Sequence, residues 1–332
     1  MSCMSLPPAL AAKAGAQGGP FTTEQAEMAG FDDREIYRRI KSGAWTRLRR
    51  GVYVETDLVP DDDEGRHLLQ LRAVVLTLPN PAVASHITAA ALFGVALLEP
   101  DLSLVHITRE HSSSSRTESG ICHHVATLPP SQLTKVDGLL TTSVARAVID
   151  FAREAPFDAA LVVAESALNK KLTTLTELRE VLAYCADWPG ARNAARVVSF
   201  ASPYSETAGE TLGRIAFDVL GIPQPSQQTY IYDEAGFVAR VDYYWEEQRT
   251  IGEFDGRVKY VGEKVDDDAL IKEKRREDRL RDAGAEVFRF DYAESRAKSP
   301  SIRRKAFAAF KRAAKHADTP PRFRYKLQPP PE

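Results

Sequence analysis

Three acidic side chains in the last third of the sequence have the types and spacing that suit metal-assisted phosphate chemistry. Asp242 stands alone in the apolar run RVDYYW, and Glu253 and Asp255 flank a phenylalanine in GEFDG. A charge removed from water costs several kcal/mol unless it is paired or bound to a metal. Because alternate residues of a strand share a face, Glu253 and Asp255 would project to the same side of a sheet. These acids predict a metal site. The alternative is that they are surface turn residues or form ion pairs with Arg240, Arg249 and Arg257.

A helix predicted over residues 205–222 offers a further carboxylate. Glu206 and Glu210 are four residues apart, so they share a helix face near the N-terminus, where the helix dipole favours negative charge. One of them, with Asp242 and Glu253, would provide three oxygen ligands for Mg²⁺ or Mn²⁺. Such an ion polarises a phosphodiester and activates water for in-line attack.

The strands that would position these acids follow the helix directly. Residues 228–233, 237–245 and 249–255 alternate with the period of a strand and are joined by the short segments EAG and EEQ. This pattern predicts an antiparallel meander. In the simplest register of its last two strands, Asp242 and Glu253 converge near the strand ends.

Residues 204–292 resemble the PD-(D/E)XK nucleases, in the branch related to very-short-patch-repair endonucleases. The resemblance is carried by ETLGRIAFDVLGIPQPSQQ, RVDYYW, GEFDGRVKY and KRREDRLRDAGAEVFRF. It implies a catalytic set made of Asp242, Glu253, Asp255, Lys259 and Glu210. Within that set the implied metal ligands are Glu210, Asp242 and Glu253, with Glu206 as the alternative helix ligand. The implied phosphate contacts are Arg276 and Gln228. Asp255 stands where the wider fold has lysine, and Lys259 where the branch usually has histidine.

Basic side chains gather in the first part of the chain, where residues 34–50 hold seven Lys/Arg against one Glu. Thr22 or Thr23 is expected to cap a short helix that ends at Gly30, and Asp32 with Glu35 to cap a second helix. Residues 44–55 predict a β-hairpin with a turn at Gly51. Helix, turn, helix and hairpin is the plan of a winged helix-turn-helix, with residues 33–42 as its recognition helix. The predicted DNA-binding residues are Arg34, Arg38, Arg39, Lys41, Arg47, Arg49 and Arg50. A small helical cap with a solvated basic face is the alternative.

The segment FTTEQAEMAGFDDREIYRRIKSGAWTRLRRGVYV resembles the N-terminal domain of AbiEi-type antitoxins. These proteins are the transcriptional repressors of type IV toxin-antitoxin systems. The resemblance implies binding to double-stranded DNA, and it makes a cognate toxin protein a candidate partner.

The middle region, residues 59–200, is predicted to be mostly helical, with strands near residues 102–108 and 120–128. The polar segment between these strands is predicted to be an exposed hairpin loop, and PDDDEG at residues 60–65 an exposed linker. Histidines 86, 106, 123 and 124 lie close to Cys122 in this region. Because residues 122, 123 and 124 would point to alternate faces of a strand, core or surface histidines are favoured over a metal site.

The C-terminal tail is basic, with eleven Lys/Arg against one Asp over residues 296–326. An amphipathic helix is expected near residues 301–317, and the Pro-rich end is expected to be disordered. Hydrophobic residues make up 43% and charged residues 27% of the 332-residue chain, a balance typical of a globular protein. Its three widely spaced cysteines suit reduced thiols, and neither a secretory signal nor a membrane span is evident. A cytoplasmic protein with no membrane partner is therefore expected.

Taken together, the sequence predicts a mixed α/β multidomain chain. Residues 1–58 would form the winged helix-turn-helix, 59–200 the middle domain, 201–295 a restriction-endonuclease-like domain, and 296–332 the basic helix and tail. The leading hypothesis is a DNA-binding protein with a Mg²⁺- or Mn²⁺-dependent endonuclease-like domain, in a defence or toxin-antitoxin context. The alternative is a non-enzymatic antitoxin-type regulator whose C-terminal domain only binds nucleic acid or a partner.

Overall fold

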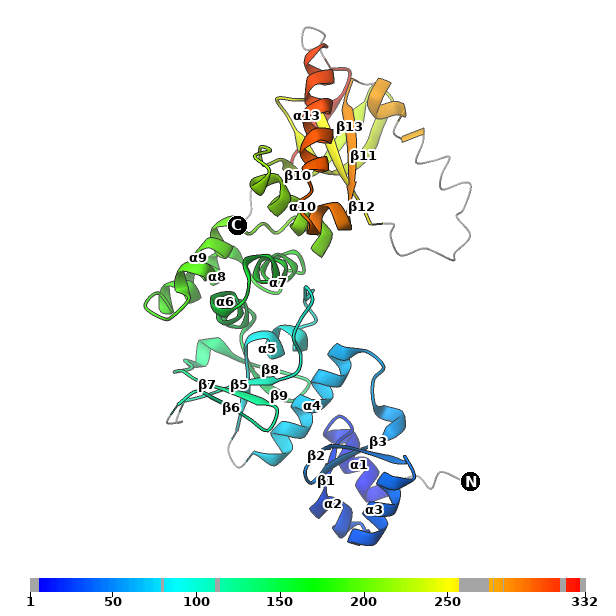
Figure 1. Cartoon of the computed structure of the whole chain (residues 1–332), viewed down its shortest axis with the longest axis vertical. Helices are drawn as coiled ribbons and strands as arrows, with labels where there is room; N and C mark the ends of the chain where they lie inside the picture. The colour runs from blue at the N-terminus through cyan, green and yellow to red at the C-terminus, as the bar shows by residue number, and fades with distance from the viewer. Residues whose placement is uncertain are drawn as a thin grey trace. The chain divides into compact units, whose positions relative to one another are not determined.

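The computed structural model describes residues 6–78, 81–110, 114–256, 275–276, 278–282, 284–316 and 321–328 (Figure 1). Its contacts divide the chain into two compact units. The first contains Met1–Ala155 and Glu177–Ala195, and the second contains Pro156–Thr176 and Arg196–Glu332. This division into two units does not test the finer boundaries at residues 58, 200 and 295, which stay predictions. None of the helices in the described part of the chain is long and apolar enough to cross a membrane.

The N-terminal part of the first unit has the predicted order of helix, turn, helix and hairpin. Its elements are α1 (Pro8–Ala16), β1 (Phe21–Thr22), α2 (Thr23–Met28), α3 (Asp33–Lys41), β2 (Trp45–Arg49) and β3 (Val52–Glu55), with strand order β1-β3-β2. Thr22 and Gln25 form a capping box at the start of α2, and the Asp32 side chain accepts a hydrogen bond from the backbone N–H of Glu35. Phe21 and Phe31 pack edge-on against Trp45. These contacts pack β1 and the turn before α3 against β2.

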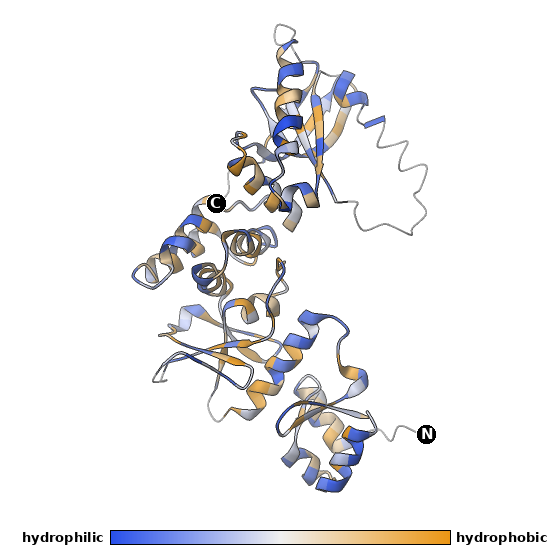
Figure 2. Cartoon of the chain, viewed as in Figure 1, coloured by the Kyte–Doolittle hydropathy of each residue, from blue (hydrophilic) through white to orange (hydrophobic). Residues whose placement is uncertain are grey.

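The middle region of the first unit holds a six-stranded sheet in the order β6-β7-β5-β4-β9-β8. Its elements are α4 (Asp63–Thr77), β4 (Val83–Ala84), α5 (His86–Leu92), β5 (Val105–Arg109), β6 (Arg116–Glu118), β7 (Ile121–Val125), β8 (Leu133–Val136), β9 (Leu139–Thr142) and α6 (Val144–Glu154). Two further helices, α8 (Leu175–Tyr184) and α9 (Ala191–Phe200), follow later in the chain. The buried hydrophobic residues of this sheet lie on β4, β5, β7 and β9, whereas α3 is mostly hydrophilic (Figure 2).

Two predictions for this region are wrong. The PDDDEG segment is not a linker, because Asp62 caps α4 and accepts a hydrogen bond from the Gly65 N–H at 2.7 Å. Strands β5 and β7 do not form a hairpin, because they pair in parallel, and the hairpin joins β6 to β7 instead. Ser119 and Gly120 both have positive φ between β6 and β7, as a tight hairpin turn requires. The three residues of β6 are polar and exposed, so no apolar alternation marked them as a strand.

The second unit contains a five-stranded sheet in the order β13-β12-β11-β10-β14. Its elements are α7 (Phe157–Asn169), α10 (Ala208–Val219), β10 (Ser226–Asp233), β11 (Gly236–Trp245), β12 (Thr250–Asp255), β13 (Glu286–Asp291), α12 (Tyr292–Arg296), α13 (Pro300–Ala314) and β14 (Arg324–Lys326). The predicted meander of β10, β11 and β12 is confirmed, and β13 adds in parallel to β12. Part of the tail predicted to be disordered is ordered, because β14 pairs with the edge of β10.

Helices α10 and α13 cover an aromatic core on this sheet. Phe217 of α10 packs edge-on against Tyr243 and Phe290, and Ile302 of α13 is fully buried in the same cluster. The start of α10 approaches the sheet so closely that a Cβ on Gly209 would overlap the Phe254 ring, and a Cβ on Gly213 would lie 2.8 Å from the Tyr243 Oη. Small residues at these two positions let α10 bring its N-terminal carboxylates to the sheet.

Candidate functional site

The strand register of the second unit brings four polar residues to one part of the sheet. Gln228 lies between the pairs Gln227–Tyr243 and Thr229–Val241, at the Asp242 position of β11, and has a positive φ of 49°. The pairing of β11 with β12 ends at Tyr243 and Gly252, next to Asp242 and Glu253. Glu253 pairs with Arg289 of β13. We call Gln228, Asp242, Glu253 and Arg289 the polar row.

Glu210 joins this row from the first turn of α10. Its Oε2 accepts hydrogen bonds from the Glu206 backbone N–H and from the Gln228 amide, each at 3.0 Å, and its Oε1 accepts one from the Thr207 hydroxyl at 3.0 Å. Burial raises the pKa of Glu210 to about 7, and the nearby Asp242 carboxylate adds to that rise. The other helix candidate, Glu206, points elsewhere, because it forms an ion pair with Arg240 at 2.7 Å.

The two strand acids are each held by a different partner. The Phe254 backbone N–H donates to Asp242 Oδ2 at 2.9 Å, and burial raises the pKa of Asp242 with a contribution from the Glu253 charge. Glu253 is only 8% exposed. Its Oε1 accepts a hydrogen bond from Arg276 Nη2 at 2.7 Å, and its Oε2 lies 3.1 Å from Arg289 Nη2. Both oxygens of Glu253 therefore face guanidinium groups.

The predicted acids lie near one another but do not form a compact set of metal ligands. In the part of the chain that the structure describes, Glu210, Asp242 and Glu253 are not a group whose ligand atoms all lie within 4.8 Å of one another. Asp255 ends β12 two residues beyond Glu253, in register with Asp291. Lys259 lies outside the described residues. The resemblance pointed to Arg276, whereas Arg289 was missed because its place beside Glu253 depends on the parallel pairing of β13.

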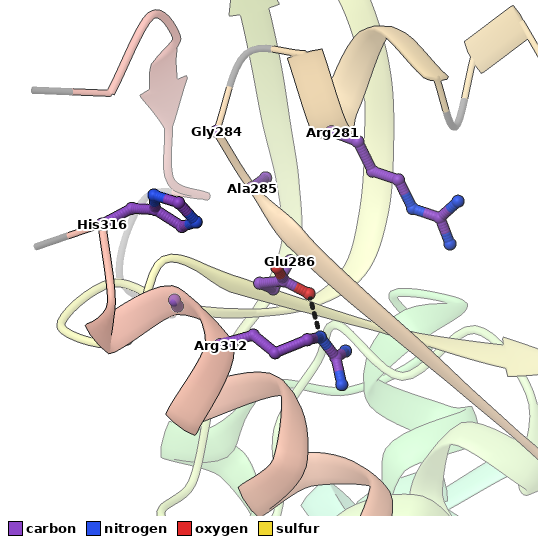
Figure 3. Close-up of a pocket in the computed structure, with 7 residues that line it drawn as sticks. Arg281, Gly284, Ala285, Glu286, Arg312 and His316 are labelled. Atoms are coloured by element: carbon purple, nitrogen blue, oxygen red, sulfur yellow. Dashed lines mark hydrogen bonds and ion pairs between the residues drawn. The ribbon is translucent and has the colours of Figure 1, made fainter. Parts of the chain in front are cut away.

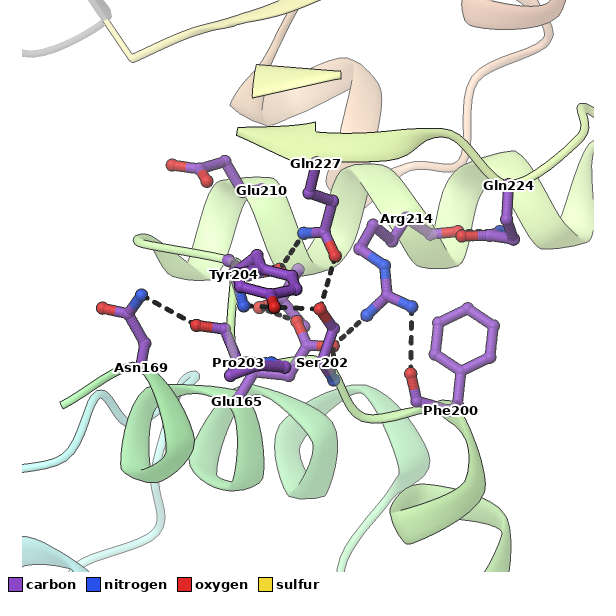
Figure 4. Close-up of polar contacts among 12 residues, drawn as sticks. Glu165, Asn169, Phe200, Ser202, Pro203, Tyr204, Glu210, Arg214, Gln224 and Gln227 are labelled. Atoms are coloured by element: carbon purple, nitrogen blue, oxygen red, sulfur yellow. Dashed lines mark hydrogen bonds and ion pairs between the residues drawn. The ribbon is translucent and has the colours of Figure 1, made fainter. Parts of the chain in front are cut away.

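A buried ion pair between α7 and α10 holds α10 in position. Glu165 of α7 is fully buried and pairs with Arg214 of α10 (Figure 4). It also accepts hydrogen bonds from the Thr211 hydroxyl at 2.8 Å and the Ser202 backbone N–H at 3.0 Å. Burial raises the pKa of Glu165, against the lowering influence of the Arg214 charge. This network fixes α10 relative to α7, and no sequence pattern indicated it because its members are far apart in the chain.

A cavity of about 390 Å³ lies at another part of the second unit, between β13 and the end of α13 (Figure 3). Arg312 Nε donates to Glu286 Oε2 at 2.7 Å inside it, and Arg281 and His316 also line it. None of its lining residues belongs to the polar row. Its chemistry is therefore separate from that of the acids.

The basic residues of the N-terminal domain form an exposed stripe on α3. Arg34, Tyr37, Arg38 and Lys41 have the i, i+3, i+4, i+7 spacing of one helix face, and all four are exposed. Tyr37 is 63% exposed and was not among the predicted contacts, although the same spacing would have identified it. The β2–β3 hairpin corresponds to the wing of a winged helix-turn-helix, and its residues Arg47 and Arg50 are exposed as well.

Arg39 is placed differently from the rest of the predicted DNA contacts. Its Nε donates to Glu35 at 2.9 Å, and its guanidinium lies over the rings of Phe31 and Trp45 at 5.5 and 5.9 Å. Arg39 therefore packs on the domain core instead of projecting with Arg34 and Arg38.

A second basic feature lies beside the wing in the same unit. Arg49 and Arg50 line a cavity of about 570 Å³ together with Arg109, Arg116 and His123. The Nε and Nη2 atoms of Arg109 are buried without a hydrogen-bond partner. Unpaired guanidinium nitrogens beside a cavity are a ready site for an anion.

The middle histidines converge, contrary to the expectation from their spacing. One ring nitrogen from each of His86, His106 and His124 lies within 4.8 Å of the others. The reason is the parallel pairing of β5 with β7, which aligns His106 with Cys122 and puts His124 on the same face. His123 points to the opposite face, as predicted.

Comparison with known proteins identifies the N-terminal part of the chain. Residues 8–56 match the family described as transcriptional regulator, AbiEi antitoxin. The chain begins with an AbiEi antitoxin-type regulator domain. This match supports a DNA-binding regulator and a toxin-antitoxin context.

Longer matches are to proteins of Mycobacterium tuberculosis. Two curated proteins, uncharacterized protein MT2308 of strain CDC 1551 / Oshkosh and uncharacterized protein Rv2248 of strain ATCC 25618 / H37Rv, are each 26% identical to this chain over 256 residues, covering 74% of this chain and 85% of theirs. The crystal structure of the RV2827C protein from the same species covers 60% of this chain and 78% of its own, with 15% identity and a TM-score of 0.38. These likenesses assign no activity.

Proposed function

We propose that this protein is a DNA-binding regulator of the AbiEi antitoxin type whose C-terminal unit hydrolyses DNA phosphodiesters at a Mg²⁺ or Mn²⁺ site of the PD-(D/E)XK type. The observation that carries the proposal is the grouping of Glu210, Asp242 and Glu253 at one part of the sheet. Glu210 is hydrogen-bonded to Gln228 of β10, and the Phe254 N–H next to Glu253 is hydrogen-bonded to Asp242. The order of α10, the antiparallel strands β10, β11 and β12, and helical backbone at residues 275–276 and 278–282 agrees with the order of helix, strands and helix in the nuclease resemblance.

The donor set of the polar row suits a hard divalent ion. Carboxylate and amide oxygens are the ligands that Mg²⁺ and Mn²⁺ prefer. Gln228 Oε1 is buried without a hydrogen-bond partner, and an ion or an ordered water would satisfy such an acceptor. Glu210, Asp242 and Glu253 would hold the ion, which when bound would polarise the scissile phosphodiester. Glu210 would then be held in its ionised form.

Metal binding at this site would require Glu253 to leave the two arginines that it pairs with. Arg276 and Arg289 occupy both oxygens of Glu253, and guanidinium groups bind phosphate as readily as carboxylate. A DNA phosphate would compete for them and release Glu253 toward an ion. The same two ion pairs favour the second candidate function, in which the C-terminal unit binds nucleic acid or a partner, such as a cognate toxin, without cleaving it.

A cleavage assay separates the two candidates. The full-length protein is incubated with plasmid, single-stranded and mismatched DNA in Mg²⁺ or Mn²⁺. We expect cleavage by the wild type, and loss of cleavage in Asp242→Asn and Glu253→Gln. Glu234→Gln, which changes an exposed acid in the β10–β11 turn, serves as the matched control. Cleavage that persists in both site variants would contradict the site, and absence of cleavage by the wild type would favour the non-enzymatic regulator.

A binding assay tests the regulator domain separately. We expect Arg34→Ala combined with Arg38→Ala to weaken binding to duplex DNA and to reduce the slope of log K against log salt by about 2, since each lost phosphate contact removes roughly 0.9. Arg179→Ala combined with Arg192→Ala removes the same charge from exposed positions on α8 and α9. Equal salt slopes for the two double variants would refute α3 as the DNA-binding helix.

A further inference from the structure

A compact cluster of imidazoles in the first unit has no part in the proposed DNA chemistry. His86 opens α5, His106 lies in β5 and His124 in β7. Glu154, the last residue of α6, lies beside them. His106 Nδ1 is 3.0 Å from His124 Nε2, and Glu154 Oε1 is 3.7 Å from His86 Nε2 and 3.9 Å from His124 Nδ1. Three elements of the fold thus bring three ring nitrogens together, and Glu154 lies beside two of the rings.

The nitrogens of these histidines are near enough to share an ion. One nitrogen from each of His86, His106 and His124 lies within 4.8 Å of the other two, and ligands of a tetrahedral ion with bonds of about 2.0–2.1 Å lie roughly 3.3 Å apart. His106 Nδ1 and His124 Nε2 are already 3.0 Å apart. The His86 and His124 rings are stacked, with centroids 3.6 Å apart and planes inclined by 16°, so the rings must shift for all three nitrogens to bind one ion.

The surroundings of His86 hold its ring in place. Its Nδ1 lies 3.0 Å from the Ser85 hydroxyl, a contact that leaves Nε2 directed toward Glu154. Its backbone has a φ of 53°, a left-handed conformation that is costly for a residue with a side chain and is concentrated at functional sites. Half of the Glu154 side chain is exposed, so an ion can reach the cluster from that side.

We propose that His86, His106 and His124 bind one divalent transition-metal ion, with Zn²⁺ as the best fit and water in its fourth position. Imidazole nitrogens match the ligand types of zinc sites, whereas Mg²⁺ and Ca²⁺ require oxygen donors. The ion ties α5, β5 and β7 together, and its binding stabilises the folded first unit.

Metal titration of the untagged full-length protein tests this proposal. After chelator treatment and dialysis, we expect one Zn²⁺ per chain, a higher thermal midpoint with Zn²⁺, and intense visible absorption with Co²⁺, which marks tetrahedral coordination. His106→Gln and His124→Gln should each weaken Zn²⁺ binding by more than about 100-fold, because even loss of a residue that only orients a ligand costs about 10–100-fold. His316→Gln, an exposed histidine of the second unit, should bind Zn²⁺ as the wild type does.

Two results would overturn the proposal. One is a wild-type protein that takes up neither Zn²⁺ nor Co²⁺, a measurement that does not depend on whether any variant folds. The other is binding of unchanged affinity in His106→Gln and His124→Gln variants whose circular dichroism matches the wild type. A Zn²⁺ affinity that falls equally in His316→Gln would likewise count against the cluster.

Discussion

Glu210 is a buried carboxyl group whose titration should govern how the stability of the second unit depends on pH. Its pKa in the folded chain is about 7 against an ordinary value of 4.5. The folded state therefore holds the proton more tightly than the unfolded state, and stability falls as pH rises from 4.5 to 7. At 1.36 kcal/mol for each pKa unit, the loss amounts to about 3 kcal/mol above pH 7.

Substitution of Glu210 by glutamine isolates this effect. Glutamine keeps the shape and one acceptor of the protonated acid but does not titrate. We expect Glu210→Gln to match the wild type near pH 4.5 and to exceed its free energy of unfolding by up to about 3 kcal/mol at pH 8. Hydrogen exchange of β11 and β12 peptides in a urea series measures that free energy for the second unit alone. Glu234→Gln should follow the wild type at every pH, because Glu234 is exposed.

Divalent ions provide the second arm of this experiment. An ion held by the ionised Glu210 would stabilise the wild type above pH 7, so Mg²⁺ or Mn²⁺ should shrink its deficit relative to Glu210→Gln. A difference between the two proteins that does not change with pH would refute the burial argument. If the difference between the two proteins depends on pH but neither Mg²⁺ nor Mn²⁺ changes it, Glu210 is a buried acid and the metal site is refuted.

Three further changes test the packing and the DNA surface. Gly209→Ala should destabilise the second unit by about 1–3 kcal/mol, because the added Cβ would overlap the Phe254 ring of β12. Gly15→Ala, which has open space around its Cβ, should instead raise the free energy of unfolding by up to about 1 kcal/mol. Equal effects of the two substitutions in urea unfolding would contradict the close approach of α10 to the sheet. Arg214→Met should lower the free energy of unfolding by about 3–5 kcal/mol, because it leaves Glu165 buried without its ion-pair partner. The double variant with Glu165→Met should recover part of that loss. Additive losses in urea unfolding would show that the two side chains do not interact. Tyr37→Ala should leave stability within about 0.5 kcal/mol yet weaken duplex binding in fluorescence anisotropy, and unchanged affinity would remove Tyr37 from the DNA surface.

Local patterns in the sequence were sufficient to predict the helices and strands that carry the candidate acids and the basic residues. The meander of β10, β11 and β12 was predicted from alternation and short turns, and capping residues marked α2 and α3. What local pattern cannot show is which strands become neighbours. Arg289 reaches Glu253 only because β13 adds in parallel to β12, and His106 meets His124 only because β5 and β7 are parallel. Pairings between distant segments decided both outcomes.

The two candidate metal sites can be told apart by their donor atoms. The histidine cluster of the first unit offers nitrogen, whereas Glu210, Asp242 and Glu253 of the second unit offer oxygen. Imidazole selects Zn²⁺ over Mg²⁺, and carboxylates with water select Mg²⁺ and Mn²⁺. Mg²⁺ should therefore change the pH dependence of β11 and β12 without altering Zn²⁺ uptake, while His106→Gln should remove the bound Zn²⁺ without altering the response to Mg²⁺. Because each ion has its own unit and its own variants, failure of one site leaves the other independently testable.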